Sequence, residues 1–234
     1  MVTDVIHVML DLETWGTEPG CDLRSIGACV FDPVTGYTTD PNDLIEMNCN
    51  IPHTFYTATD NPRGYYGTGA SRDRFFITDK PNNRREYALT RDPKTEQWWS
   101  EQSEAAQGAF EKPVQLFTAL HMFTEWLVKV CPDQTNLRLW AHGPVFDVSI
   151  LAAVYKVVGL PVPWHYRAPR DTRTAFDMAG IDDHSAWLAQ HPGPLGIPHH
   201  ALDDAICQAR AVCGAWGRIR DQHTLRPIGD VPHA

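Results

Sequence analysis

Two acidic residues, Asp11 and Glu13, stand at the end of an apolar run with one residue between them. Side chains alternate between the two faces of an extended strand, so both carboxylates project from the same face. Two like charges so close together are costly beside an apolar sheet unless a cation neutralises them, and Mg²⁺ and Mn²⁺ prefer carboxylate oxygens. The spacing therefore predicts a divalent-cation site. The alternative is a strand end that carries two charges into solvent.

Two further polar positions fall where an α/β topology would converge on this strand. Asp147 lies at the turn from a predicted strand into a predicted helix, and ligands in open α/β sheets bind outside such strand ends. A helix N-cap is the alternative for Asp147. The stretch 199–204 places two histidines and two aspartates at the start of the last predicted helix. Capping and compensation of the helix dipole are the alternative for those acids.

The elements that position these residues predict an α/β fold with a mixed central sheet flanked by helices. Apolar and β-branched runs predict a three-stranded antiparallel opening meander, with strands at 5–10, 26–31 and 46–51, and parallel strands after it. Apolar periodicity and helix-terminating residues predict helices that begin at 92–93 and that span 114–130, 146–158 and 201–218, with a short helix that ends at 179 and is capped by Asp171 or Thr172. The same features predict a strand at 137–141, an edge strand at 165–170 and a loop at 182–198.

The segment 52–93 differs from its surroundings, because Gly, Pro, Asn, Asp and Arg are frequent and apolar periodicity is lost. It predicts an insertion without regular structure in a single domain that spans residues 1–234. One interpretation is a solvated loop. The other is a substrate flap whose cations meet phosphates, carried by Arg72, Arg74, Lys80, Arg84, Arg85 and Arg91.

Composition limits the class of protein. A formal charge of −9 argues against a domain that holds nucleic acid by bulk electrostatics, but not against a nuclease whose bound cations reverse the local sign. Six Cys without a C-x-x-C pair predict reduced thiols. The N-terminus has no basic and then apolar segment, and no apolar stretch approaches the length of a membrane span. We therefore expect a cytoplasmic protein that does not bind a membrane.

The ordered motifs carry a family resemblance. Asp11-Leu12-Glu13-Thr14, then Asp147 after a strand, then His199-x-Ala201-x-x-Asp204-Ala205 resemble the DEDDh branch of the DnaQ-like 3′-5′ exonucleases, which have an RNase H-like fold. The similarity runs from about residue 5 to 218 except for the 52–93 insertion, which compact members lack. Trp98-Trp99 and Asp171-Thr-Arg-Thr resemble the subgroup that contains phage exonuclease A-type DNases and the RNase AS type.

The resemblance implies a metal-dependent 3′-5′ exonuclease that uses two divalent cations, Mg²⁺ or Mn²⁺, and releases nucleoside 5′-monophosphates. Asp11, Glu13 and Asp204 would hold the cation that activates water, with Asp11 bridging to the second. Asp147 would reach the second cation directly or through water, and His199 would be the general base. Thr14 and Trp15 would lie beside the 3′-terminal nucleotide. The substrate would be single-stranded or 3′-ended DNA or RNA, and a homodimer is one assembly to test.

Two other functions are weighed against this one. A catalytically silent nuclease-fold module that binds nucleic acid or associates with a polymerase would have no reason to keep a repulsive set of carboxylates. A nucleotide-cofactor enzyme is disfavoured because neither G-x-G-x-x-G nor G-x-x-x-x-G-K-[ST] occurs in the sequence. Trp98 and Trp99 are interpreted either as core aromatics or as a stacking platform for a substrate base.

The choice between His199 and His200 depends on where the last helix begins. Ideal helix geometry favours His200, which lies four residues before Asp204 and therefore on the same face. Pro198 disfavours a helix that runs through it from the N-terminal side, which makes His199 a non-helical boundary residue. We therefore predict that His199 faces the carboxylates and that His200 has a mainly structural role.

Overall fold

The computed structural model describes residues 5–38, 53–59, 73–78, 84–110 and 112–224. Its main sheet has the strand order β3-β2-β1-β7-β8, and β4 also pairs with β2. The strands β1, β2, β3 and β4 pair antiparallel, whereas β7 and β8 run parallel to β1. The predicted mixed sheet is confirmed. Its strands are β1 (Ile6–Thr14), β2 (Leu23–Asp32), β3 (Tyr37–Thr38), β4 (Thr54–Ala58), β7 (Leu137–Ala141) and β8 (Pro169–Asp171).

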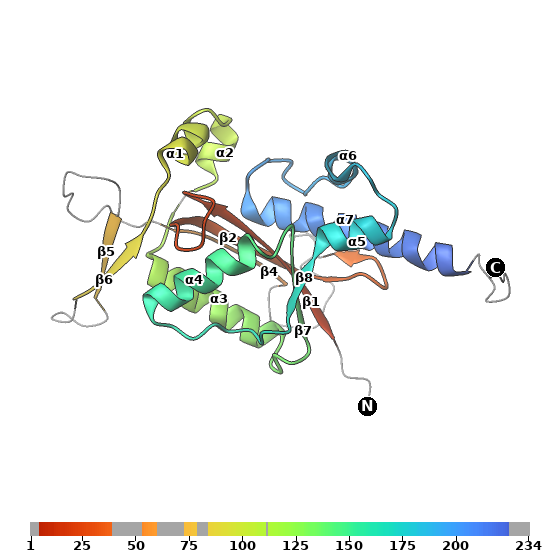
Figure 1. The fold of residues 1–234 in the computed structure, drawn as a ribbon, viewed down its shortest axis with the longest axis horizontal. Helices are drawn as coiled ribbons and strands as arrows, with labels where there is room; N and C mark the ends of the chain where they lie inside the picture. The colour runs from red at the N-terminus through yellow and green to blue at the C-terminus, as the bar shows by residue number, and fades with distance from the viewer. Residues whose placement is uncertain (1–4, 39–52, 60–72, 79–83, 111, 225–234) are drawn as a thin grey trace, which may run out of the picture.

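Helices cover both faces of this sheet (Figure 1). Because side chains alternate along β1, Val8 and Leu10 enter one core, formed with α3 and α4. Met9 enters the other core, formed with α5, α6 and α7. Asp11 and Glu13 therefore belong to the face that α7 covers. The helices are α1 (Pro93–Ser100), α2 (Glu104–Gly108), α3 (Leu116–Val130), α4 (Asp147–Val158), α5 (Thr172–Met178), α6 (His184–Ala189) and α7 (Ala201–Thr224).

The opening part of the chain differs from the prediction in two ways. The strand predicted at 46–51 lies outside the described residues, and β4 at Thr54–Ala58 pairs with β2 within the segment predicted to be an insertion. The segment also contains a separate antiparallel pair, β5 (Asp73–Thr78) and β6 (Arg84–Leu89), so it is not structureless. These strands have only five or six residues each, too few for a clear period among so many polar neighbours.

One cation of the proposed substrate flap is already paired. Arg91 forms a 2.7 Å ion pair with the buried carboxylate of Asp22. This arginine therefore anchors the segment before α1 to the end of β2 and is not available to a phosphate. Arg72 and Lys80 lie outside the described residues.

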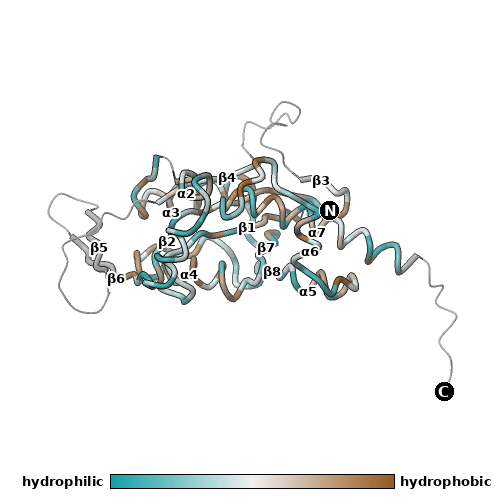
Figure 2. Tube along the Cα trace, turned by 90° about the horizontal axis from the view of Figure 1, so that it is seen from above, coloured by the Kyte–Doolittle hydropathy of each residue, from teal (hydrophilic) through white to brown (hydrophobic). Residues whose placement is uncertain are grey.

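Helix boundaries follow their capping residues. Asp92 caps α1 at the predicted helix start, and Asp171, one of the two predicted candidates, caps α5. The predicted loop at 182–198 is wrong in part, because Asp183 accepts a hydrogen bond from the Ala186 N–H and starts α6. The last helix continues past the predicted end to Thr224, and its hydrophilic C-terminal turns extend beyond the sheet (Figure 2). No helix in the described ranges is long and apolar enough to cross a membrane.

Candidate active site

The strand β1 carries Asp11 and Glu13 past the end of its parallel partner. Pairing between β1 and β7 ends at Met9 and Trp140, so both carboxylates lie beyond the last paired residue of β7. On the other side, Asp11 pairs with Gly27 of β2. A Cβ at Gly27 would lie 2.2 Å from the backbone of Ala201, so only glycine lets the start of α7 rest on the sheet opposite Asp11.

Asp147 comes to the same place from α4. The N-cap position of α4 belongs to Phe146, so the capping alternative for Asp147 is wrong. Its carboxylate instead accepts a hydrogen bond from the Leu12 N–H at 3.2 Å. This N–H lies on the side of β1 where pairing with β7 has ended. The buried carboxylate of Asp147 therefore supplies the acceptor that β7 does not. The hydrogen bond fixes Asp147 between the two acids of β1.

The start of α7 brings His199 and Asp204 to these acids. His199 has φ of 62° and lies outside the helix, as the preceding proline predicts. Its backbone N–H donates to Oδ2 of Asp204 at 2.9 Å. Ligand atoms of Glu13, His199 and Asp204 all lie within 4.8 Å of one another. Backbone geometry therefore turns the first histidine toward β1.

The neighbouring residues His200 and Asp203 have structural partners. The His200 ring stacks on Tyr56 at 4.3 Å between centroids, and its Nδ1 accepts the Asp203 N–H at 3.3 Å. The buried Asp203 carboxylate accepts the backbone N–H groups of Leu195 and Ile197 at 2.7 and 2.9 Å. His199 and Asp204 thus face the acids of β1, whereas His200 and Asp203 hold neighbouring parts of the fold together.

The carboxylates share a strained electrostatic environment. Burial, and then the nearby acids, raises the pKa of Asp11 well above its ordinary range. Burial and Asp204 raise the pKa of Glu13 to about 8. Burial raises the pKa of Asp147 to about 7 and that of Asp204 to about 6, although backbone hydrogen bonds from Leu12 and His199 oppose these shifts. Four acids that resist ionisation together form a site for positive charge.

The donor set fits divalent cations. Carboxylate oxygens and one imidazole nitrogen converge on a single place, and hard cations such as Mg²⁺ and Mn²⁺ prefer oxygen ligands. Gln208, which the sequence reasoning missed, donates through Nε2 to Oδ1 of Asp11 at 2.7 Å. Its position four residues after Asp204, on the same face of α7, was the available signal. Gln208 orients the acid that the family pattern assigns to bridge two cations.

A cleft of about 420 Å³ opens beside these residues and is lined by Glu13, Thr14, Lys94, Trp98 and Phe146 among others. Trp98 is 40% exposed, and its ring lies 4.8 Å from that of His199. Trp99 is buried and donates its Nε1–H to the carbonyl of Thr14 at 2.9 Å, so it is a core aromatic.

Of the two predicted nucleotide-binding residues, only Thr14 lines this cleft. The Trp15 ring faces the guanidinium groups of Arg24 and Arg91, at 4.3 and 4.5 Å from its centroid. Trp98, rather than Trp15, is the exposed tryptophan that lines the cleft, and α1 carries it there.

A mixed α/β sheet that gathers four carboxylates and a histidine beyond one end of β7 is an arrangement suited to metal-dependent hydrolysis of phosphodiesters. A sequence model of the 3′-5′ exoribonuclease Rv2179c-like domain matches residues 6–216. The chain belongs to this family. The predicted membership among the 3′-5′ exonucleases is confirmed at the level of the family, and metal dependence is typical of it.

Comparison with solved structures finds the same fold at low sequence identity. Cell-death related nuclease 4 superposes with a TM-score of 0.54 and 13% identity over 90% of this chain and 63% of that one. A 3′-exonuclease described in recognition of a histone mRNA stem-loop gives 0.50 and 14%, over 94% and 84%. A full-length 3′-exonuclease gives 0.51 and 13%, over 93% and 61%. The chain thus spans less than two thirds of the first and third of these. No curated protein matches it in sequence.

Proposed function

We propose that this protein removes nucleotides one at a time from the 3′ end of single-stranded RNA, with two divalent cations as cofactors. The observation that carries this proposal is the convergence of Asp11, Glu13, Asp147, His199 and Asp204 from three separate parts of the chain. RNA is favoured over DNA because the matching family is described as an exoribonuclease. The products would be nucleoside 5′-monophosphates.

The carboxylates would hold the cations. Glu13, His199 and Asp204 have ligand atoms within 4.8 Å of one another, and Asp147 accepts the N–H of Leu12, the residue between Asp11 and Glu13. Divalent cations bound there would stabilise the charge that develops on the attacking and leaving oxygens of an in-line displacement at phosphorus. The hydrogen bonds from Gln208 to Asp11 and from the His199 N–H to Asp204 keep the oxygens of both acids oriented.

His199 would accept the proton of the attacking water. Burial lowers the pKa of its imidazole, so the ring is neutral and able to accept a proton at neutral pH. The left-handed backbone at His199 and its N–H bond to Asp204 hold the residue at the boundary of α7. Contact with the Trp98 ring limits the other orientations of the imidazole.

The cleft beside Thr14 would receive the 3′-terminal nucleoside. The exposed face of Trp98 supplies an apolar surface on which a base can stack. The cleft reaches Glu13, so a nucleoside seated there places its 5′ phosphate at the carboxylates.

Digestion of matched oligonucleotides tests this function. We expect a 5′-labelled single-stranded RNA to shorten from its 3′ end in Mn²⁺ or Mg²⁺ with release of nucleoside 5′-monophosphates, and the same sequence as DNA to be cut more slowly. Asp204→Asn is the matched inactive control. Binding of RNA without any shortening in either metal would favour the silent module. Faster digestion of DNA would overturn the choice of RNA and leave the nuclease assignment standing.

A further inference from the structure

The stretch Asp171-Thr172-Arg173-Thr174 opens α5 and has no part in the chemistry proposed above. Asp171 accepts hydrogen bonds from the Arg173 N–H at 3.2 Å and from the Thr174 hydroxyl at 2.8 Å. The first turn of α5 is therefore held firmly. The side chain of Arg173 projects from it and is exposed.

His142, the residue after β7, fixes the direction of this arginine. Arg173 donates through Nε to Nε2 of His142 at 3.4 Å, and Nδ1 of His142 lies 2.7 Å from the Thr172 hydroxyl. Since Nε2 accepts, the proton is on Nδ1 and is donated to Thr172. Burial and the charge of Arg173 lower the pKa of His142 to about 4, so the ring keeps this neutral form at neutral pH.

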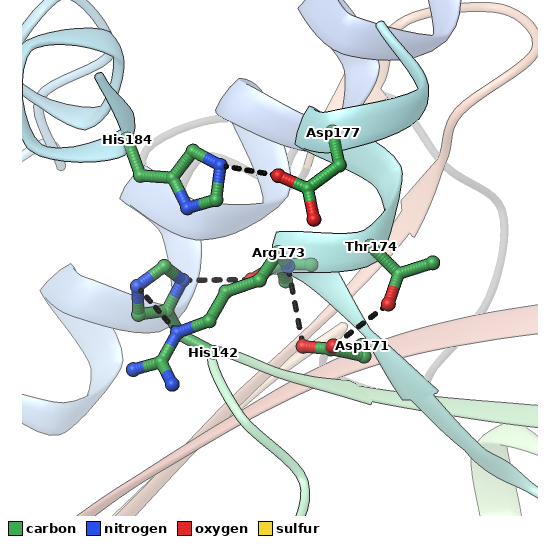
Figure 3. Close-up of polar contacts among 7 residues, drawn as sticks. His142, Asp171, Arg173, Thr174, Asp177 and His184 are labelled. Atoms are coloured by element: carbon green, nitrogen blue, oxygen red, sulfur yellow. Dashed lines mark hydrogen bonds and ion pairs between the residues drawn. The ribbon is translucent and has the colours of Figure 1, made fainter. Parts of the chain in front are cut away.

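The guanidinium group beyond Nε is left free. It lies over Gly143, where a Cβ would be 3.2 Å from Nη1, and Gly143 has φ of +101°. Its terminal nitrogens have no hydrogen-bond partner among the described residues, and Figure 3 shows them extending past His142 and away from the other side chains drawn. The nearest acids of α5 are engaged elsewhere, Asp171 in the cap and Asp177 with His184 at 3.1 Å.

The position of Arg173 relative to the carboxylates indicates its use. Residues 142–146 lead directly into Asp147, and the Arg173 guanidinium lies over Gly143 of this segment. In the strand order, β8 lies one strand beyond β7, on the side away from β2. Arg173 therefore lies outside Asp147, whereas the cleft for the terminal nucleoside lies at Glu13 and Thr14. A strand whose 3′ end fills the cleft would leave the site past Asp147 and reach Arg173.

We propose that Arg173, positioned by His142, binds the phosphate immediately 5′ to the scissile phosphodiester of the substrate strand. A planar guanidinium with two free nitrogens matches two oxygens of a phosphate. An unpaired cation at the rim of an acidic site also gives a net-acidic protein a local contact for a polyanion. The assignment rests on the proposed exonuclease function, and it adds a substrate-binding residue to that site.

Short substrates separate this contact from the chemistry. A dinucleotide with a free 5′ hydroxyl has only the scissile phosphodiester, whereas a trinucleotide adds the phosphate that Arg173 would bind. We expect Arg173→Gln to lower kcat/KM for the trinucleotide about 10- to 100-fold, the range for a hydrogen-bonded charge contact, and to leave the dinucleotide within twofold. Arg173→Lys should recover part of the loss. His142→Ala should show the same dependence on substrate length with a smaller loss.

Arg167→Gln is the matched control, because the Arg167 side chain is also exposed and donates through Nε to the hydroxyl of the adjacent Tyr166 at 2.9 Å. It should leave both substrates unchanged. Equal losses on the two substrates in Arg173→Gln, or no loss on either, would overturn the assignment while wild-type cleavage still supports the proposed function. Failure of the wild-type protein to cleave either substrate would instead overturn the proposed function itself. Thermal melting of each variant checks that the fold is kept.

Discussion

The two histidines before α7 lie next to each other but face different partners. We expect His199→Ala to lower kcat by about 10²- to 10⁴-fold, the range for loss of a positioned general base. His200→Ala should keep kcat within a few-fold of wild type, because its ring stacks on Tyr56 and its Nδ1 accepts the Asp203 N–H, and should lower thermal stability instead. Steady-state rates and melting curves of both variants make the comparison.

The pH profile gives a second readout of the same residue. The pKa of His199 is lowered from 6.5, so the wild-type rate should fall only below that pH, as the imidazole becomes protonated and cannot accept a proton. His199→Ala should lose this acidic limb. A large loss of kcat in His200→Ala with a normal rate in His199→Ala would move the base to His200.

The adjacent acids Asp203 and Asp204 provide a similar contrast. Asp203→Ala should cost about 3 kcal/mol of unfolding free energy, because two backbone N–H groups lose a charged acceptor that is itself buried. Asp204→Asn should abolish hydrolysis, and in metal-free buffer its unfolding free energy should equal or exceed that of wild type, since it removes one of several repelling charges. Denaturant unfolding and RNA digestion measure the two effects. Unchanged turnover with Mn²⁺ in Asp204→Asn would exclude Asp204 as a metal ligand.

At the scale of elements, α1 places one tryptophan in the core and one at the cleft. Trp99→Ala should lower the unfolding free energy by about 3–5 kcal/mol, since it empties a buried site and leaves the Thr14 carbonyl without its donor. Trp98→Ala should keep most of the stability and raise KM for RNA, because a stacked base contributes about 1–3 kcal/mol. An unchanged KM in Trp98→Ala would rule out the stacking role.

The contact between α7 and β2 positions the acids of both elements, and it depends on Gly27. A methyl group at Gly27 would overlap the backbone of Ala201 and Leu202, so Gly27→Ala should displace α7 and cost about 3 kcal/mol of stability. Activity should fall with it, because His199 and Asp204 move away from Asp11.

Gly217→Ala is the control for this variant. Gly217 lies in α7 with no atom within 4 Å of the added methyl group, so alanine should stabilise the helix slightly, by about 0.5–1 kcal/mol. If Gly27→Ala retained full activity and stability, the close approach of α7 would not be what positions the site.

The sequence predicted those features that depend on local pattern. The apolar run of β1, the caps at Asp92 and Asp171, and the break at Pro198 each depend on a few neighbouring residues. Features that depend on distant contacts were missed. Capping preference alone could not show that Asp147 bonds to Leu12, and nothing near Trp15 indicated that two guanidinium groups lie over its ring.

Across the whole molecule, the residues of the candidate site also differ in whether local sequence patterns or contacts between distant elements indicate them. Strand alternation indicated Asp11 and Glu13, and the order of the motifs indicated His199 and Asp204, whereas Gln208 meets Asp11, and Trp98 the cleft, through the packing of α7 and α1. The short strands β5 and β6, in the polar segment after β4, were not predicted, because the composition of this segment gives no clear apolar alternation.

The protein as a whole should be least stable without metal at alkaline pH. In the folded state the pKa values of Asp147, Asp204 and Glu13 rise to about 7, 6 and 8, from ordinary values of 3.8 for Asp and 4.5 for Glu. The folded protein therefore binds more protons than the unfolded chain between about pH 4 and pH 8, so the unfolding free energy falls as pH rises through this window.

Bound divalent cations replace those protons, and the stabilisation that they give should grow with pH across the same window. We expect the melting temperature in EDTA to decline from pH 5.5 to 8, and the difference between Mn²⁺ and EDTA to widen over that range. Asp204→Asn should show a shallower decline in EDTA and a smaller gain with Mn²⁺, because it lacks one of the coupled acids. Asp133→Asn, at an exposed turn before the start of β7 and therefore at the opposite end of that strand from Asp147, should follow the wild-type curves. Parallel melting curves in Mn²⁺ and EDTA would show that the four carboxylates do not bind the metal together.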